Sequence, residues 1–341
     1  MYFLGIETSC DETAAACLRV EGRTAQVLAE EVSSQFSVHA LYGGVVPELA
    51  SREHLAALPV IVESVMRSAQ VNFEDLAAIG VTRGPGLKGC LLMGCSFAKA
   101  LSLAHKLALI GVNHIEAHIH AALLDNPALC YPFLSMVVSG GHTEIVEVEG
   151  LGRYKLWART IDDAAGEAFD KSANLLGFSY PGGAKLAELA ETQTSSPFKL
   201  PRVMRGTEGF SFSGLKTAIA MLIKEQAAAL AADAAGTRAS LAYAVQEAIV
   251  DSLCYKLEAA VKQTGAKMVS LSGGVSANKM LRRKVGELKG VNAFFPEPNH
   301  CLDNGAMVAF VAARRYLSGQ RDKLDFPVLA RWPVEELGAL D

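Results

Sequence analysis

The 341-residue sequence predicts an α/β protein built from two duplicated lobes with a ligand cleft between them. An apolar strand, a small polar turn and a second apolar run occur twice, at residues 3–16 and 133–148. A strand that enters a glycine-containing turn and then a helix also occurs twice, at residues 78–86 and 268–278. The length suits two domains, and a hydrophobic content of 50% is enough for a core in each.

The elements of the first half follow from periodicity and capping. Residues 3–6 form an apolar strand, residues 47–68 a helix with a broad apolar stripe, and residues 78–82 a second strand. Residues 107–112 are a short buried strand, and Asn113 is a good N-cap for the Ala-rich helix that follows it. The first lobe is expected to cover residues 1–125.

The second half repeats this order with one addition. Strands are expected at residues 133–138, 144–148 and 268–271, and a helix at residues 306–317. A helical insertion at about residues 162–236 has no counterpart in the first half. The second lobe is expected to cover residues 126–305, and a C-terminal helical segment at about residues 306–335 is expected to pack back on the first lobe.

Composition excludes several classes of protein. The most apolar stretch, residues 90–112, is interrupted by Lys99, His105 and Lys106, so no membrane-spanning helix is expected. No signal peptide is expected either, which indicates a cytoplasmic protein. Seven cysteines without a C-x-x-C pair indicate reduced thiols, and Cys10 is interpreted as a small packed thiol rather than a nucleophile.

The net charge of -4 does not indicate a nucleic-acid surface, although it does not exclude one. Basic residues gather in two places, which are more typical of solvated faces than of an RNA footprint. These are Lys199, Arg202 and Arg205, and Arg282, Arg283 and Lys284.

Two histidines four residues apart, His114 and His118, lie on one face of the helix that follows Asn113. This spacing is typical of metal ligands. Glu116 lies two positions from each histidine and so on another face, whereas a zinc protease places its glutamate directly after the first histidine. The best third ligand is Asp303, which is expected to be the N-cap of the corresponding helix in the second half.

Three glycine-rich turns are candidates for binding phosphate, because glycine lets backbone amides approach an anion near a helix N-terminus. They are Ser139–His142, Tyr180–Gly183 and Ser272–Gly274. Residues 84–89 also match G-x-G-x-x-G after a strand, which raises a dinucleotide-binding alternative. We discount this alternative because no acidic residue closes a second strand about 20 residues further on.

Long motifs along the whole chain resemble those of the bacterial tRNA N6-adenosine threonylcarbamoyltransferase (TsaD) family, formerly described as O-sialoglycoprotein endopeptidases. The matching strings are residues 5–13, 42–52, 113–118, 138–143, 161–171, 210–216, 273–278 and 303–307. The resemblance implies the actin/sugar-kinase/heat-shock ATPase fold, with two duplicated lobes around a nucleotide cleft.

The resemblance also implies an acyltransferase reaction. The threonylcarbamoyl group would pass from threonylcarbamoyl-adenylate to N6 of adenosine 37 in tRNAs that read ANN codons, with release of AMP. It further implies one divalent metal ion, with Fe²⁺ favoured and Zn²⁺ possible, and two protein partners. These partners are a smaller TsaB-like paralogue on the first lobe and a TsaE-like P-loop ATPase.

Residues carry over from the family to this chain one by one. The implied metal ligands are His114, His118 and Asp303, the three residues already nominated from spacing. The implied substrate-binding residues are Val137, Val138, Ser139, Gly140, Gly141, Asp170, Gly183 and Asn278. The chain departs from many members at Ala184 and Ala187, where they have Pro and Asp. The resemblance therefore does not identify the residues that contact the ribose on this side of the cleft. By its place in the first turn, Asp11 is a candidate to orient or deprotonate the amine, or else a cap of that turn.

Two other function classes fit the fold. A sugar-kinase-type phosphotransferase would use Mg²⁺ held by carboxylates and phosphates, and the His-His-Asp set argues against it. A non-catalytic scaffold would be expected to lack both these ligands and the Ser139–His142 turn, and both are present.

Overall fold

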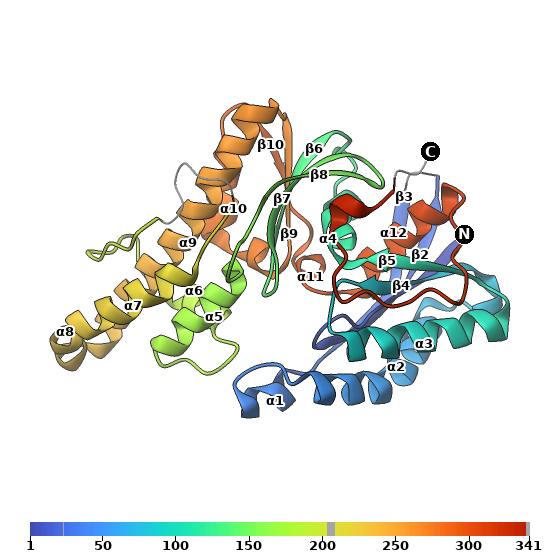
Figure 1. The fold of residues 1–341 in the computed structure, drawn as a ribbon, viewed down its shortest axis with the longest axis horizontal. Coiled ribbons are helices and arrows are strands. Elements are labelled where there is room, and N and C mark those ends of the chain that lie inside the picture. Colours follow the sequence, from blue (N-terminus) through green and yellow to red (C-terminus); the bar gives the residue numbers. More distant parts are fainter. Residues whose placement is uncertain (23, 203–208, 339–341) are drawn as a thin grey trace. The chain divides into compact units, whose positions relative to one another are not determined.

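The computed structural model describes residues 1–22, 24–202 and 209–338 (Figure 1). The chain divides into two compact units. Unit 1 comprises Met1–Phe133, Val148–Lys155 and Phe294–Asp341, and unit 2 comprises Leu134–Glu147 and Leu156–Ala293. Residues 126–133, 148–155 and 294–305, which we expected in the second lobe, therefore belong to unit 1 together with the final helix.

Each unit is built on a five-stranded sheet of the same topology. The first sheet has the order β3-β2-β1-β4-β5 and the second β8-β7-β6-β9-β10, so strands that correspond along the chain occupy corresponding positions. In both sheets the central strand pairs in parallel with the strand that comes third after it along the chain, β1 with β4 and β6 with β9. The duplicated α/β fold predicted from the sequence is confirmed. The strands are β1 Tyr2–Glu7, β2 Glu12–Glu21, β3 Thr24–Ser34, β4 Leu76–Gly84, β5 Ala108–Asn113, β6 Phe133–Val138, β7 Thr143–Gly150, β8 Arg153–Arg159, β9 Met268–Ser272 and β10 Asn292–Phe294.

The helices of unit 1 flank its sheet, and those of unit 2 include the predicted insertion. Unit 1 contains α1 Phe36–His39, α2 Pro47–Ala69, α3 Lys88–His105, α4 His114–Asp125, α11 Pro298–Cys301 and α12 Gly305–Leu317. Unit 2 contains α5 Ala165–Leu175, α6 Gly183–Glu191, α7 Ser213–Glu225, α8 Ala227–Ala232, α9 Ala234–Thr264 and α10 Lys279–Gly286. Among the helices of the described chain, none has the length and apolarity that crossing a bilayer requires.

The last α-helix matches the helix predicted at residues 306–317, but the helical segment expected to reach about residue 335 does not continue beyond it. α12 ends at Leu317 rather than near residue 335, because Gly319 takes a left-handed backbone angle (φ 91°) that turns the chain away. The chain then runs along the sheet edge, where the Asp322 amide donates to the Leu109 carbonyl and the Leu329 amide to the Arg83 carbonyl, and it forms a short 3₁₀ helix at Val334–Glu336. α12 itself packs on β1, β2 and β4, as expected.

Alternating side chains of β1 divide the unit 1 core between two faces of the sheet. Phe3 packs with residues of α4 and α12, whereas Leu4 and Ile6 pack with residues of α2 and α3. The apolar stripe of α2 is largely used here, since Leu58, Ile61, Val62 and Val65 are all buried against the sheet.

Glycines allow α12 to lie directly on the sheet. A Cβ on Gly5 of β1 would collide with the carbonyl oxygen of Gly305, and one on Gly305 would collide with the main chain of Ala15 in β2. No other residue type fits at either position without a shift of the backbone. The start of α12, and with it the segment that carries Asp303, is therefore fixed against β1 and β2.

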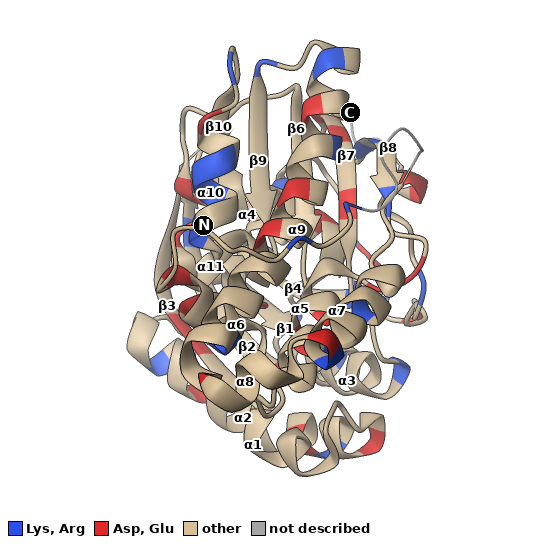
Figure 2. Ribbon diagram, turned by 90° about the vertical axis from the view of Figure 1, so that its left-hand side faces the viewer, with Lys and Arg blue, Asp and Glu red and all other residues tan. Residues whose placement is uncertain are grey.

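The basic clusters seen in the sequence are partly neutralised within unit 2. Arg202 donates from Nη2 to Asp251 and Glu247 at 2.6 and 2.8 Å, and Lys284 of α10 also pairs with Asp251. In Figure 2 the Lys and Arg positions of α10 are coloured blue on the ribbon. Arg205 lies outside the described residues.

The contact between α12 and the sheet can be tested with Gly305→Ala. The added methyl group meets rigid main-chain atoms, so we expect the free energy of unfolding to fall by about 3 kcal/mol, as measured by urea unfolding followed by circular dichroism. Gly44→Ala is the control, since a Cβ there meets nothing within 4 Å. Wild-type stability of the Gly305→Ala protein would contradict the close approach.

Candidate functional site

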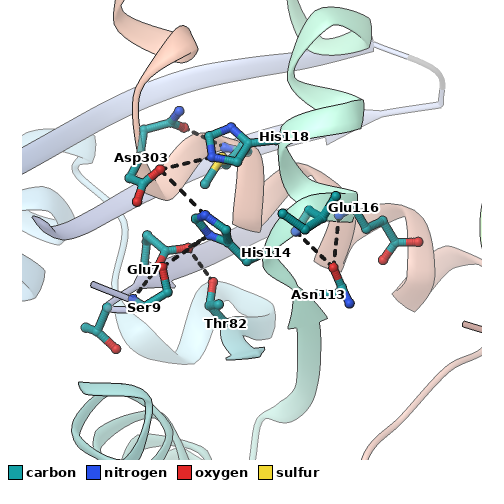
Figure 3. A network of polar contacts seen from close by, with 12 residues as sticks. Glu7, Ser9, Thr82, Asn113, His114, Glu116, His118 and Asp303 are labelled. Atoms are coloured by element: carbon teal, nitrogen blue, oxygen red, sulfur yellow. Dashed lines mark hydrogen bonds and ion pairs between the residues drawn. The ribbon is translucent and has the colours of Figure 1, made fainter. Parts of the chain in front are cut away.

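His114 and His118 are positioned by the start of α4. β5 ends at Asn113, whose side chain accepts hydrogen bonds from the amides of Ile115 and Glu116 at 2.9 and 3.1 Å. This is the N-cap that the sequence predicted. It fixes the first turn of α4, so that the two imidazoles project on one side, with ring centroids 4.7 Å apart and planes at 84° (Figure 3).

Asp303 completes this group from the segment before α12. Its Oδ1 lies 2.9 Å from His118 Nε2 and 3.7 Å from His114 Nε2. Asp303 is not the N-cap that we expected. Asn304 caps α12 instead by accepting from the Met307 amide at 2.8 Å, which leaves the Asp303 carboxylate directed at the histidines (Figure 3).

The geometry of the three side chains fits a metal ion. Two ligand atoms that are each about 2.1 Å from a tetrahedral ion lie about 3.4 Å apart, and the two separations from Asp303 Oδ1 fall on either side of that value. Ligand atoms of all three residues lie within 4.8 Å of one another. Two imidazoles and a carboxylate suit Fe²⁺ and Zn²⁺.

Glu7, which the sequence analysis missed, orients His114. Its buried carboxylate lies 3.1 Å from His114 Nδ1 and accepts from Thr82 Oγ1 at 2.6 Å. Although burial would raise the pKa of Glu7, the contact with His114 lowers it. An ionised Glu7 accepts a hydrogen bond from His114 Nδ1–H, so that Nε2 carries the lone pair that can bind a metal ion. This is the usual arrangement around a metal-bound histidine. The missed signal was a carboxylate at the end of an otherwise apolar strand.

A further pair of carboxyl groups adjoins this site in the turn between β1 and β2. The Asp11 side chain is 8% exposed and lies within hydrogen-bonding reach of Cys10 and Glu12. Burial, together with Asp303 and Asp11, raises the pKa of Glu12 to about 10. Burial also raises the pKa of the Cys10 thiol, which agrees with a packed thiol. The excess of carboxyl groups favours a cation here.

Unit 2 contains the predicted substrate-binding residues, several of which also have structural partners. Val137 and Val138 are buried at the end of β6, whereas Gly140 and Gly141 are exposed in the following turn, with nothing within 4 Å of a Cβ on either. The α5 N-terminus packs closely on this turn, since the Gly166 amide donates to the Ser139 carbonyl at 3.1 Å. The two exposed glycines therefore leave backbone near a helix N-terminus accessible to a ligand.

The other three predicted residues are tied to their surroundings. Asp170 Oδ1 accepts from the amides of Gly182 and Gly183 at 3.0 and 2.8 Å, which joins α5 to the start of α6. Asn278 caps α10 through the Leu281 amide and donates to Gln246 at 2.7 Å. These contacts explain why each residue type is needed, whatever it binds.

The G-x-G-x-x-G match between β4 and α3 has a structural explanation. A Cβ on Gly84 would collide with the Leu329 carbonyl, and one on Gly86 would meet the carbonyl oxygen of Ser9 at 2.6 Å. Both glycines are thus occupied by close contacts with the chain itself, in agreement with our rejection of a dinucleotide site.

The segment that leads to Asp303 is held by His300. Its Nδ1 lies 2.8 Å from Asp125 Oδ1 at the end of α4, and its Nε2 lies 3.4 Å from Glu30 of β3. Burial alone would lower the pKa of His300, but hydrogen bonds to these two carboxylates raise it to about 9. The folded protein therefore binds a proton here that the unfolded chain would release near pH 6.5.

This ion pair predicts a pH dependence of stability. Because the folded pKa is raised, the stabilisation is fully present below about pH 6.5 and disappears as the pH rises through about 9. The shift corresponds to on the order of 3 kcal/mol. Urea unfolding of the wild type and His300→Asn should show a difference at pH 6.5 that is lost at pH 10. The control His105→Asn removes the contact with Glu74, which is 73% exposed, and should change little at either pH.

Solved structures of similar fold can be aligned with nearly the whole chain. Component A of the (R)-2-hydroxyglutaryl-CoA dehydratase from Acidaminococcus fermentans is 18% identical, with a TM-score of 0.54, over 92% of this chain and 97% of that one. HypF from T. kodakarensis is 15% identical, with a TM-score of 0.60, over 93% of this chain and 48% of that one. At these identities the likeness shows the fold alone, which is of the actin-like type.

The family is shown by a separate comparison. The model of the TsaD family, described as tRNA N6-adenosine threonylcarbamoyltransferase, matches residues 26–310. This match covers far more than half of the chain and includes His114, His118 and Asp303. The chain therefore belongs to the TsaD family of tRNA N6-adenosine threonylcarbamoyltransferases.

Proposed function

We propose that this protein transfers the threonylcarbamoyl group of threonylcarbamoyl-adenylate to N6 of adenosine 37 in tRNAs that read ANN codons. The observation that carries the proposal is the convergence of His114, His118 and Asp303 in a chain of this family. A tRNA substrate also supports action in the cytoplasm. The phosphotransferase alternative is disfavoured because this donor set is not one that hydrated Mg²⁺ prefers.

The reaction needs orientation more than covalent catalysis. The N6 amine attacks the carbamoyl carbon of the mixed anhydride, the new C–N bond forms, and the C–O bond to phosphate breaks. AMP leaves with that electron pair, and the amine loses one proton. The anhydride is already a strong electrophile, so holding the two reactants in line supplies much of the rate.

His114, His118 and Asp303 are proposed to hold one divalent ion, Fe²⁺ in preference to Zn²⁺, with Glu7 fixing the first imidazole. When bound, such an ion supplies a Lewis acid that polarises the acyl-adenylate. The exposed amides of Gly140 and Gly141 are proposed to bind the phosphate of the acyl-adenylate.

Other proposed contacts are more indirect. Val137, Val138 and Ser139 form the strand end that presents the glycine turn, and Asp170 holds Gly183 in place by hydrogen bonds. Asn278 is proposed to contact the adenylate from the start of α10. Ala184 and Ala187 in α6 carry no polar group, so any ribose contact there must come from the backbone or other side chains. Asp11, beside Glu12 and Asp303, is proposed to orient the amine or accept its proton.

The proposed reaction can be tested directly. The chain, loaded with Fe²⁺ and supplemented with its partners, is incubated with threonylcarbamoyl-adenylate and unmodified tRNA, and the digested nucleosides are analysed. We expect N6-threonylcarbamoyladenosine at position 37 of ANN-reading tRNAs and an equal amount of AMP. Unmodified adenosine in the presence of all components would refute the proposed reaction.

Variants of the three ligands should lose metal while remaining folded. We expect His114→Ala, His118→Ala and Asp303→Ala each to lose most bound metal and most transferase activity, since each removes one of three protein ligands. His120→Gln is the matched control, because His120 lies on the same helix but contacts Tyr131 Oη at 2.9 Å instead. Full metal occupancy in the double histidine variant, by elemental analysis, would show that the ion binds elsewhere.

A protein partner is proposed to dock near α2. Large hydrophobic side chains stay exposed in this region although most of the helix stripe is buried, namely Leu41 (84%), Tyr42 (64%), Leu55 (65%) and Val60 (65%). The family resemblance supports a TsaB-like paralogue as the occupant and a TsaE-like P-loop ATPase as a further member of the assembly. Because the chain is acidic overall, partners that add basic surface would also aid tRNA binding.

Introducing a charge on this apolar surface should separate partner binding from metal binding. We expect Leu55→Glu to weaken binding of the paralogue by at least about tenfold in calorimetry and to abolish its stimulation of turnover, with metal content unchanged. Leu103→Glu is the control, since this leucine is 70% exposed on α3. Equal loss in both variants, or in neither, would contradict docking at α2.

A further inference from the structure

Glu116, the acidic residue between the two metal-type histidines, makes a buried ion pair on the opposite side of α4. Arg315 of α12 donates to it from Nε at 2.7 Å and from Nη2 at 2.6 Å. Tyr154 of β8 donates to Glu116 Oε1 at 2.6 Å. The Glu116 carboxylate is 0% exposed and the arginine 5% exposed, so this is an ion pair in the core of unit 1.

Stability alone does not account for this arrangement. Removing two charges from water costs about as much as their attraction returns, and well-packed apolar residues often replace such a pair without loss. A forked arginine does, however, define a direction and a distance that apolar contacts do not. The pair is therefore suited to fixing geometry.

The apolar core around α4 and α12 mixes small and large side chains. It includes Ala117 and Ala121 on α4 and Ala309 and Ala312 on α12, together with larger residues such as Phe310. Apolar contacts hold two helices together but specify their relative position less sharply than a forked ion pair does. The contact between Glu116 and Arg315 adds such a directional link between α4 and α12.

That position determines the geometry of the metal site. His114 and His118 belong to α4, whereas Asp303 precedes α12 by two residues and is held with it against the sheet. A slide of α4 by about 1 Å would move both imidazoles relative to the Asp303 carboxylate. A metal site tolerates displacements of only about 0.5 Å. Glu116 lies two positions from each histidine and so acts on both.

We propose that Glu116, Arg315 and Tyr154 are positioning residues of the metal site, which hold α4 where its two imidazoles meet Asp303. This inference rests on the proposed function of His114, His118 and Asp303 as ligands. None of the three positioning residues contacts the ion. Their contribution is to the affinity and coordination geometry of the site.

The test is a Co²⁺ titration of the metal-free full-length protein, followed by its visible absorption. The variant Glu116→Leu/Arg315→Met/Tyr154→Phe removes the polar link but retains apolar volume, so its unfolding in urea should resemble that of the wild type. We expect Co²⁺ to bind about tenfold more weakly, with a changed absorption band. Arg315→Lys keeps the charge but loses the forked hydrogen bonds, so it is expected to show the same effect to a smaller degree. This variant carries the test if the triple variant does not fold.

A matched control separates positioning from general destabilisation. Leu58→Ala in α2 creates a cavity in the opposite face of the same sheet, so it should lower stability but leave Co²⁺ affinity and absorption unchanged. An unchanged Co²⁺ affinity and spectrum in both the triple variant and Arg315→Lys would overturn the inference. Failure of the wild type to bind Co²⁺ would instead overturn the ligand assignment of the proposed function, and the inference with it.

Discussion

The direct backbone contact between Gly5 and Gly305 is the constraint on which the rest of unit 1 depends. It places the start of α12 against the two strands that lead into the Cys10–Glu12 turn, with no side chain between them. Asp303 is consequently held beside α4, and Arg315, further along α12, meets Glu116. One glycine contact therefore brings together residues from the two ends of the chain.

Much of the site could be predicted from the sequence because it is encoded locally. The spacing of His114 and His118 needs only helix periodicity, and the capping role of Asn113 needs only its position before an apolar helix. The duplicated strand order likewise follows from repeated short patterns. The wrong prediction of Asp303 as an N-cap had a local cause too, since Asp303 and Asn304 are adjacent and both are good caps. Only the hydrogen bond to Met307 distinguishes them.

The remaining features depend on contacts between distant segments. Glu7 of β1 reaches His114 and is itself held by Thr82 of β4, and Arg315 reaches Glu116 across 199 residues. Glu7 and Arg315 are each recognisable in the sequence as a charged residue in an apolar element. The sequence does not indicate which residue either of them contacts. In unit 2, Asp170 and Asn278 combine a proposed ligand role with capping and turn contacts. Sequence alone does not separate these roles, since either one explains the residue.

The separation of the proposed metal ligands along the chain has a thermodynamic consequence. His118 and Asp303 are 185 residues apart, and the segment between them contains all of unit 2. An ion that joins them acts as a cross-link that closes a very long loop, and any ligand that binds only the folded state raises the free energy of unfolding. Metal supply would then govern the lifetime of the folded enzyme in addition to its turnover, and chelation would expose the chain to proteolysis before any active-site residue had changed.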